Sequence, residues 1–103
     1  MFTHCVFFRL KEETTSDDRI KFEEGLRSLT TTPGALHGTF GVPARTDRPV
    51  VERSYSYGLM VNFDDLAAHD AYQVHPVHKE FLKNCASLWS HVQVYDFVDP
   101  PGR

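Results

Sequence analysis

Residues 55–63, with the sequence YSYGLMVNF, alternate apolar and polar side chains more regularly than any other stretch of this 103-residue chain. The residues expected on one face of an extended strand are Tyr55, Tyr57, Leu59, Val61 and Phe63. A period of two is typical of a strand that buries one face and exposes the other. The sequence therefore predicts a half-buried strand at residues 55–63, near the middle of the chain.

Two helical pieces and another strand are expected after this segment. A short helix runs to Tyr72 from Asp64 or Asp65, because an aspartate side chain can cap the first free backbone N–H groups of a helix. Pro76 suits the first position of a second helical piece, since its φ is fixed near the helical value. Residues 92–98 are the last predicted strand.

Two strands and a helix are expected before residues 55–63. Residues 2–10 and 36–42 read as strands, and between them Phe22, Leu26 and Leu29 follow the i, i+4, i+7 spacing of an amphipathic helix. The resulting order, β-α-β-β-α-β, predicts an α+β fold of the ferredoxin-like type. This fold is a four-stranded antiparallel sheet with two helices on one face.

The predicted sheet has a second apolar face. The first strand places Phe2, Val6 and Phe8 on one side and Cys5 and Phe7 on the other. A strand that met water on one side would instead alternate apolar with polar residues. A large apolar surface usually marks a protein interface, and two identical faces can cover each other in a symmetric dimer. We therefore expect a homodimer formed through the sheet faces.

The charge and hydropathy of the chain indicate which partners and which cellular compartment to expect. The formal charge is -3, without a cluster of Lys and Arg, so nucleic acid is not an expected partner. No apolar run is long enough to span a bilayer and the first residues lack a signal-peptide pattern, so we expect a cytoplasmic protein without membrane contact. Residues 1–99 are read as one domain and 100–103 as a short tail. Cys5 and Cys85 are expected to be reduced, non-catalytic thiols.

Residues 71–78, AYQVHPVH, are the candidate functional motif. His75 precedes a proline and is therefore the expected N-cap, which places His78 at the third helical position. The partial positive charge of a helix N-terminus disfavours imidazolium, so His78 is expected to be neutral and able to act as a general base. Tyr72 is close enough in sequence to share a pocket and to hydrogen-bond a carbonyl or an enolate.

A purely structural interpretation of the motif stays open beside this one. His78 can bond back to the backbone of the N-cap, as Glu does in a capping box, and Tyr72 can be a core aromatic. A metal site is not expected at His75 and His78, because no third ligand stands nearby in a recognised spacing.

His4 is a further candidate, because it alternates with Val6 and Phe8 and so projects to the same face of the first strand. A buried histidine needs a hydrogen-bond partner. One interpretation is a core histidine bonded to a backbone carbonyl, and the other is a wall of the His78 pocket. Trp89 either lines that pocket or fills the core. The expected ligand-binding residues are His4, Val6, Phe8, His75 and Trp89, whereas His37, His69 and His91 are expected at the surface.

Several motifs together resemble the stress-responsive α/β-barrel (Dabb) family. They are HCVFFRLK at residues 4–11, VNFDDLAAHDAY at 61–72, YQVHPVH at 72–78, Trp89 and VQVYDF at 92–97. The resemblance implies a ferredoxin-like fold that dimerises through its sheets into an α/β barrel. A characterised plant member of that family closes a linear polyketide by a cofactor-free aldol condensation.

The histidine base and the tyrosine of that plant cyclase correspond here to His78 and Tyr72. A further pocket histidine corresponds to His4, and a tryptophan of the closing segment to Trp89. The resemblance thus implies that a small apolar carbonyl compound binds without a cofactor, that His78 abstracts a proton beside the carbonyl, and that Tyr72 stabilises the enolate. The alternatives are a non-catalytic stress or structural dimer, which a closed core at His78 would favour, and a cofactor-free monooxygenase.

Overall fold

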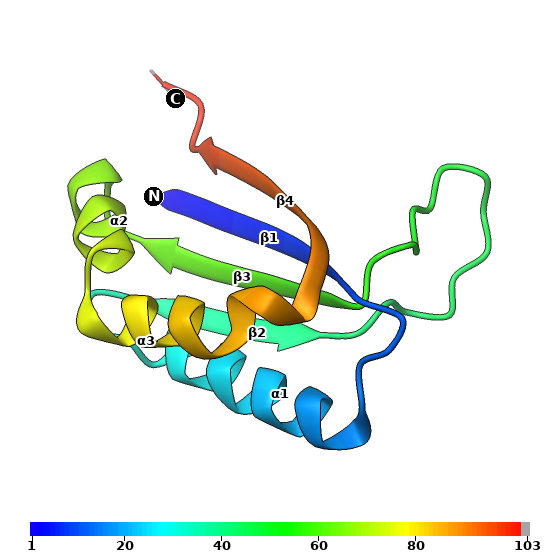
Figure 1. Cartoon of the computed structure of the whole chain (residues 1–103). Coiled ribbons are helices and arrows are strands. Elements are labelled where there is room, and N and C mark those ends of the chain that lie inside the picture. Colours follow the sequence, from blue (N-terminus) through cyan, green and yellow to red (C-terminus); the bar gives the residue numbers. More distant parts are fainter. Residues whose placement is uncertain (102–103) are drawn as a thin grey trace.

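The computed structural model describes residues 1–101, and its elements follow the predicted order. They are β1 (Phe2–Leu10), α1 (Ser16–Thr30), β2 (His37–Gly41), β3 (Tyr57–Phe63), α2 (Leu66–Gln73), α3 (Pro76–Cys85), the short 3-10 helix η1 (Ala86–Leu88) and β4 (Trp89–Val98) (Figure 1). The strands form one antiparallel sheet in the order β2-β3-β1-β4. The ferredoxin-like prediction is confirmed, with the second helix divided into α2 and α3. Residues 102 and 103 of the expected tail lie outside the described residues.

Helix α1 begins at a capping box. The Thr15 side chain accepts a hydrogen bond from the backbone N–H of Asp18 at 3.1 Å, and the Asp18 carboxylate accepts one from the backbone N–H of Thr15 at 3.3 Å. Such a cap contributes about 1 kcal/mol to helix stability. The helix buries Phe22, Leu26 and Leu29 as its spacing predicts.

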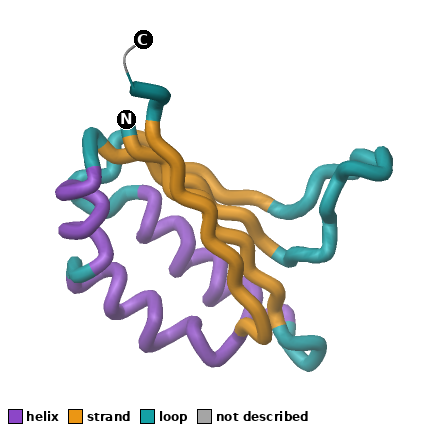
Figure 2. The backbone as a smooth tube through the Cα atoms, turned by 90° about the horizontal axis from the view of Figure 1, so that it is seen from above, coloured by secondary structure: helices purple, strands orange, loops and turns teal. Residues whose placement is uncertain are grey.

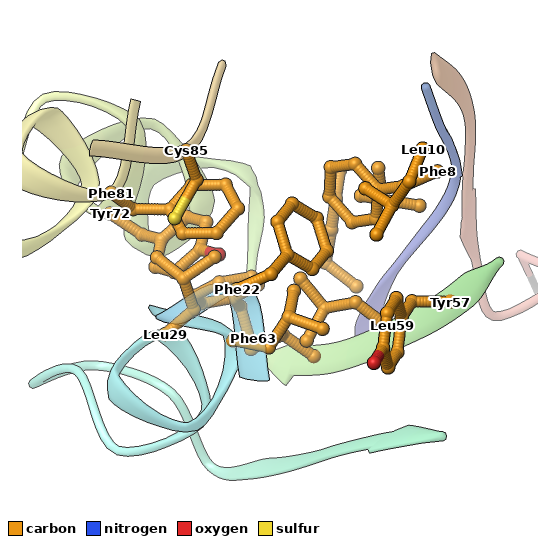
Figure 3. Close-up of a cluster of buried hydrophobic side chains, with 14 residues drawn as sticks. Phe8, Leu10, Phe22, Leu29, Tyr57, Leu59, Phe63, Tyr72, Phe81 and Cys85 are labelled. Atoms are coloured by element: carbon orange, nitrogen blue, oxygen red, sulfur yellow. The ribbon is translucent and has the colours of Figure 1, made fainter. Parts of the chain in front are cut away.

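The core fills the space between the helices and one face of the sheet (Figure 3). Phe22, which has no exposed surface, lies near its centre. Its ring centroid is 5.2 Å from that of Phe8, 5.3 Å from Tyr57 and 5.8 Å from Phe81. Trp89 completes the group at 6.3 Å. A single side chain of α1 thus joins β1, β3, α3 and the start of β4.

Strand β3 is shorter than predicted, and Tyr55 does not share the face of Tyr57. The first pair of the β1–β3 ladder is Phe8 with Tyr57, so Tyr55 lies before the pleated strand. Its ring packs instead on Phe7, at 5.0 Å between centroids, against the face of the sheet without helices. Side chains alternate between the two faces only where the backbone is a paired, pleated strand. The predicted strand included residues 55 and 56, which lie before that paired segment.

The sheet has an open face and an apolar edge. Figure 2 shows the helices gathered on one side of the sheet. On the open side Phe7 packs between Tyr55 and Tyr95, whose centroids are 5.0 and 6.1 Å away. Strand β4 lies at the edge of the sheet next to β1, and its exposed large apolar residues are Val92, Val94, Tyr95, Phe97 and Val98. The second apolar surface predicted from the sequence is therefore present.

The connection between β2 and β3, residues 42–56, projects from the body of the molecule as a mostly exposed loop (Figures 1 and 2). Within residues 1–101, no helix has both the length and the apolar character needed to cross a bilayer. Cys5 and Cys85 are free thiols, half-buried and buried respectively, as expected.

Candidate functional site

The junction between α2 and α3 is built as predicted. His75 is the N-cap of α3, with extended φ and ψ of −65° and 143°, and Pro76 is the first helical residue. The His75 ring caps the helix itself, because its Nδ1 accepts a hydrogen bond from the backbone N–H of Val77 at 3.1 Å. The His75 side chain therefore stabilises the start of α3, and it does not line the cavity between the sheet and α3.

A cavity of about 190 Å³ lies between the sheet and α3. It touches His4, Val6, Phe8, Tyr72, His78 and Trp89, all of which were named from the sequence. The other lining residues are Leu29, Leu59, Gln73, Phe81, Leu82, Val92 and Val94. An apolar cavity with a few convergent polar groups is the usual form of a small-molecule site. A more voluminous hollow of about 450 Å³ on the open sheet face, beside Phe7 and Tyr95, contains none of the candidate catalytic residues.

Tyr72 and His78 meet at this cavity, edge to face, with ring centroids 5.1 Å apart. The hydroxyl of Tyr72 and Nδ1 of His78 are both buried, and neither has a hydrogen-bond partner within residues 1–101. Each unpaired buried polar group costs about 1–3 kcal/mol, so two of them side by side require an explanation. Burial also raises the pKa of the Tyr72 phenol well above its usual range, which keeps its proton available for donation.

His78 is held neutral, but the main cause differs from the one predicted. Loss of solvation on burial lowers the pKa of His78, and the nearby His4 and His69 lower it further. The sequence prediction attributed this neutrality to the helix N-terminus. The alternative in which His78 bonds back to the N-cap is not observed in the described part of the chain, since its Nδ1 has no partner.

The hydrogen-bond partner of His4 is a side chain of the neighbouring strand β4. It is directly opposite Asp96 in the β1–β4 ladder, and its Nδ1 lies 2.5 Å from Oδ1 of Asp96. Burial lowers the pKa of His4, while the hydrogen bond to Asp96 acts in the opposite direction. The interpretation that a backbone carbonyl would satisfy His4 was wrong. Asp96 interrupts the apolar series of Val92 and Val94 on one face of β4, a signal that the sequence already contained.

His69 was expected at the surface, and this expectation was wrong. Only 12% of its side chain is exposed, and its ring stacks on Phe2 with centroids 4.5 Å apart. Its centroid is also 5.0 Å from that of His4. His69 precedes Tyr72 by three positions on α2, so both residues face the sheet. His37 and His91 are exposed, as expected.

The order of the elements, the sheet order β2-β3-β1-β4 and the helices on one face define the ferredoxin-like α+β class. Within this class, residues 2–99 match the family described as Stress responsive A/B Barrel Domain, or Dabb. The chain belongs to the Dabb family, and the resemblance stated from its motifs is confirmed. No protein with a curated description matches the chain in sequence.

Solved structures place the chain among other members of this fold. A dimeric ferredoxin-like protein of unknown function from Jannaschia sp. is 30% identical, with a TM-score of 0.73 over 95% of this chain and 98% of that one. A Dabb family protein from Mesorhizobium loti is 25% identical, with a TM-score of 0.76 over 96% of both chains. A hydroxynitrile lyase from Passiflora edulis is 18% identical, with a TM-score of 0.78 over 99% of this chain and 95% of the lyase.

Proposed function

We propose that this Dabb protein binds a small apolar carbonyl compound in the 190 Å³ cavity and removes a proton from the carbon next to the carbonyl. The observation that carries the proposal is the pair of buried, unpartnered polar atoms at the cavity, the Tyr72 hydroxyl and Nδ1 of His78. One is a donor suited to a carbonyl oxygen, and the other can accept a proton when the ring is neutral. A ligand that engaged both would remove their desolvation penalty.

The proposed chemistry needs only these two side chains. Tyr72 donates its O–H to the carbonyl oxygen, and neutral His78 takes the proton from the α-carbon, whose C–H electron pair moves into the enolate. Returning the proton from imidazolium to carbon restores the starting state. Alternatively, the enolate attacks a second carbonyl carbon to form a C–C bond, and the resulting alkoxide takes the proton from the imidazolium. The raised pKa of Tyr72 keeps the donor protonated, and the lowered pKa of His78 keeps the base free.

The size and lining of the cavity define the ligand class. An apolar cavity of about 150 Å³ is known to bind benzene, so about 190 Å³ suits an aromatic ring with one small polar substituent. The lining contains Phe8, Phe81 and Trp89, which favour an apolar or aromatic ligand. The shared fold of the Passiflora edulis hydroxynitrile lyase gives independent support, since a hydroxynitrile is the cyanide adduct of a carbonyl compound.

Acetophenone in D₂O provides a direct test, because abstraction of a methyl proton is seen as deuterium incorporation by ¹H NMR. We expect EDTA-treated protein to accelerate the exchange above the rate in buffer. We expect Tyr72→Phe to slow it by roughly 100- to 1,000-fold, the usual effect of removing one oxyanion donor. The same variant should be at least as stable as the parent, because it removes a buried unpaired hydroxyl.

Tyr55→Phe is the matched control, because Tyr55 packs on Phe7 at the open sheet face and lies outside the cavity. Its exchange rate should equal that of the parent. The proposal fails if the parent protein exchanges no faster than buffer, or if Tyr72→Phe and Tyr55→Phe behave alike.

We also propose that the open sheet face is covered by a second copy of the chain. The aromatic group of Phe7, Tyr55 and Tyr95 on this face supports the proposal, as does the dimeric Jannaschia protein with 30% identity. We expect Phe7→Glu to give a monomer in analytical ultracentrifugation, because burying an unpaired carboxylate between two sheets is strongly unfavourable. Val74→Glu, at an exposed apolar residue between α2 and α3, should leave the dimer intact. Equal sedimentation of the two variants would contradict this interface.

A further inference from the structure

His4, His69 and Asp96 form a cluster beside the cavity that the carbonyl chemistry does not use. One potential ligand atom from each residue lies within 4.8 Å of those of the other two. The three come from β1, α2 and β4, so only the tertiary structure brings them together. Two imidazoles and one carboxylate are a donor set typical of zinc and related divalent transition metals.

The His69 ring is held in an orientation suited to a ligand. It stacks on Phe2 at 4.5 Å and meets the edge of Phe63 at 5.7 Å, so packing fixes the plane of the imidazole. Its Nδ1 lies 3.1 Å from Oδ1 of Asp70. A carboxylate at one ring nitrogen favours the tautomer with the proton on that nitrogen, and it leaves Nε2 as the acceptor that a metal would use. The Gln73 amide nitrogen lies 3.3 Å from Nε2 and donates to it, so a metal at Nε2 would displace this side-chain amide.

His4 and Asp96 supply the other two ligand atoms, and a cation can bind between them if the two side chains move apart. The 2.5 Å contact between Nδ1 of His4 and Oδ1 of Asp96 is a hydrogen bond. Two ligands about 2 Å from a tetrahedral ion are about 3.3 Å apart, so a metal that displaces the proton requires the pair to separate slightly. Asp96 is on the edge strand β4 and is exposed, which permits this movement. A metal on Nδ1 of the neutral His4 ring would take the place of this hydrogen bond, and the single ring proton would then be on Nε2.

We propose that His4, His69 and Asp96 bind a divalent transition metal of the zinc class, with one coordination position left for water or a small ligand. Three protein ligands with an open position are the pattern of catalytic rather than structural zinc sites. Magnesium is not the expected ion, because it prefers an all-oxygen octahedral shell. The burial of His4 supports the site, since it favours the neutral imidazole that ligation requires. The proposal is independent of the carbonyl chemistry, which is assayed in EDTA.

The test uses full-length protein without a histidine tag, with Co²⁺ as a coloured substitute for Zn²⁺. Visible absorption bands of four- or five-coordinate Co²⁺ should appear at one equivalent per chain, and Zn²⁺ should displace them whereas excess Mg²⁺ should not. We expect His69→Gln and Asp96→Asn each to weaken Co²⁺ binding by roughly 10-fold or more. His91→Gln, which removes an exposed histidine outside the cluster, is the matched control and should bind as the parent does.

Circular dichroism and thermal unfolding of His69→Gln and Asp96→Asn would show whether each variant remains folded. Asp96 is exposed, so its variant should remain folded even if the His69 variant does not. The site is overturned if the parent binds no Co²⁺, or if a folded Asp96→Asn binds as tightly as the parent. It is equally overturned if His91→Gln loses as much affinity as the cluster variants, or if Mg²⁺ displaces Co²⁺.

Discussion

Replacing His78 with glutamine is expected to slow deuterium exchange into acetophenone by roughly 100- to 10,000-fold, the usual contribution of a positioned general base. Glutamine preserves much of the volume but cannot accept a proton at neutral pH. The fold should tolerate the change, since Nδ1 of His78 makes no hydrogen bond within residues 1–101. The measurement is the ¹H NMR rate for parent and variant, with His91→Gln as control. An unfolded His78→Gln protein, or one with the parent rate, would contradict a role for His78 as the base.

The pH profile of the parent gives a second readout for His78. Burial and the neighbouring His4 and His69 lower its pKa from the usual 6.5. The neutral, active form therefore predominates above 6.5, and the exchange rate should fall only when the pH drops through the lowered pKa. We thus expect, after subtraction of the buffer rate, a plateau at neutral pH and a midpoint below 6.5. A midpoint above 6.5 would show that a different group is the base.

Replacing Phe22 with alanine is expected to lower the free energy of unfolding by about 3–5 kcal/mol, the range measured for buried phenylalanines. The reason is that the ring is fully buried and contacts aromatic side chains from three other elements, namely Phe8, Tyr57 and Phe81. Small domains are stable by only about 5–15 kcal/mol, so the loss is a large part of the total. Urea unfolding followed by circular dichroism, at one fixed protein concentration, measures the difference.

Ile20→Ala is the matched control in the same helix, because Ile20 is 58% exposed. Its effect should be below about 1 kcal/mol. If Phe22→Ala is too unstable to purify, Phe22→Leu retains part of the volume and should lie between the control and the alanine variant. Equal unfolding midpoints for Phe22→Leu, Ile20→Ala and the parent would show that the aromatic group around Phe22 is not the centre of the core.

The elements and their caps could be predicted because they depend on neighbours a few residues apart. Phe22, Leu26 and Leu29 follow the i, i+4, i+7 spacing of one helix face, and they are buried as predicted. His75 became an N-cap because the next residue is proline, a local restriction on the backbone. The prediction for Tyr55 was wrong. The alternating pattern of the sequence includes this residue, but the β1–β3 pairing ends at Tyr57, so Tyr55 is not part of the strand.

The candidate site was predicted only in part. His4, Tyr72, His78 and Trp89 line one cavity, as the motif and the strand alternation indicated. His69 was missed although its spacing from Tyr72 places both on one helix face, and the error came from treating a histidine without neighbouring histidines as a surface residue. Asp96 was missed because its pairing with His4 joins strands at opposite ends of the chain.

The sequence by itself determined the order of the elements, the junction at His75 and the face to which His4, Tyr72 and His78 belong. These properties follow from dihedral restrictions and from periods of 2 and 3.6 residues, which act over a few positions. Only the tertiary structure decided that His78 is neutral, because desolvation and the approach of His4 and His69 are set by packing between β1, α2 and α3. The same packing left the Tyr72 hydroxyl and Nδ1 of His78 unpaired in the described part of the chain, at a cavity bounded by the sheet and α3.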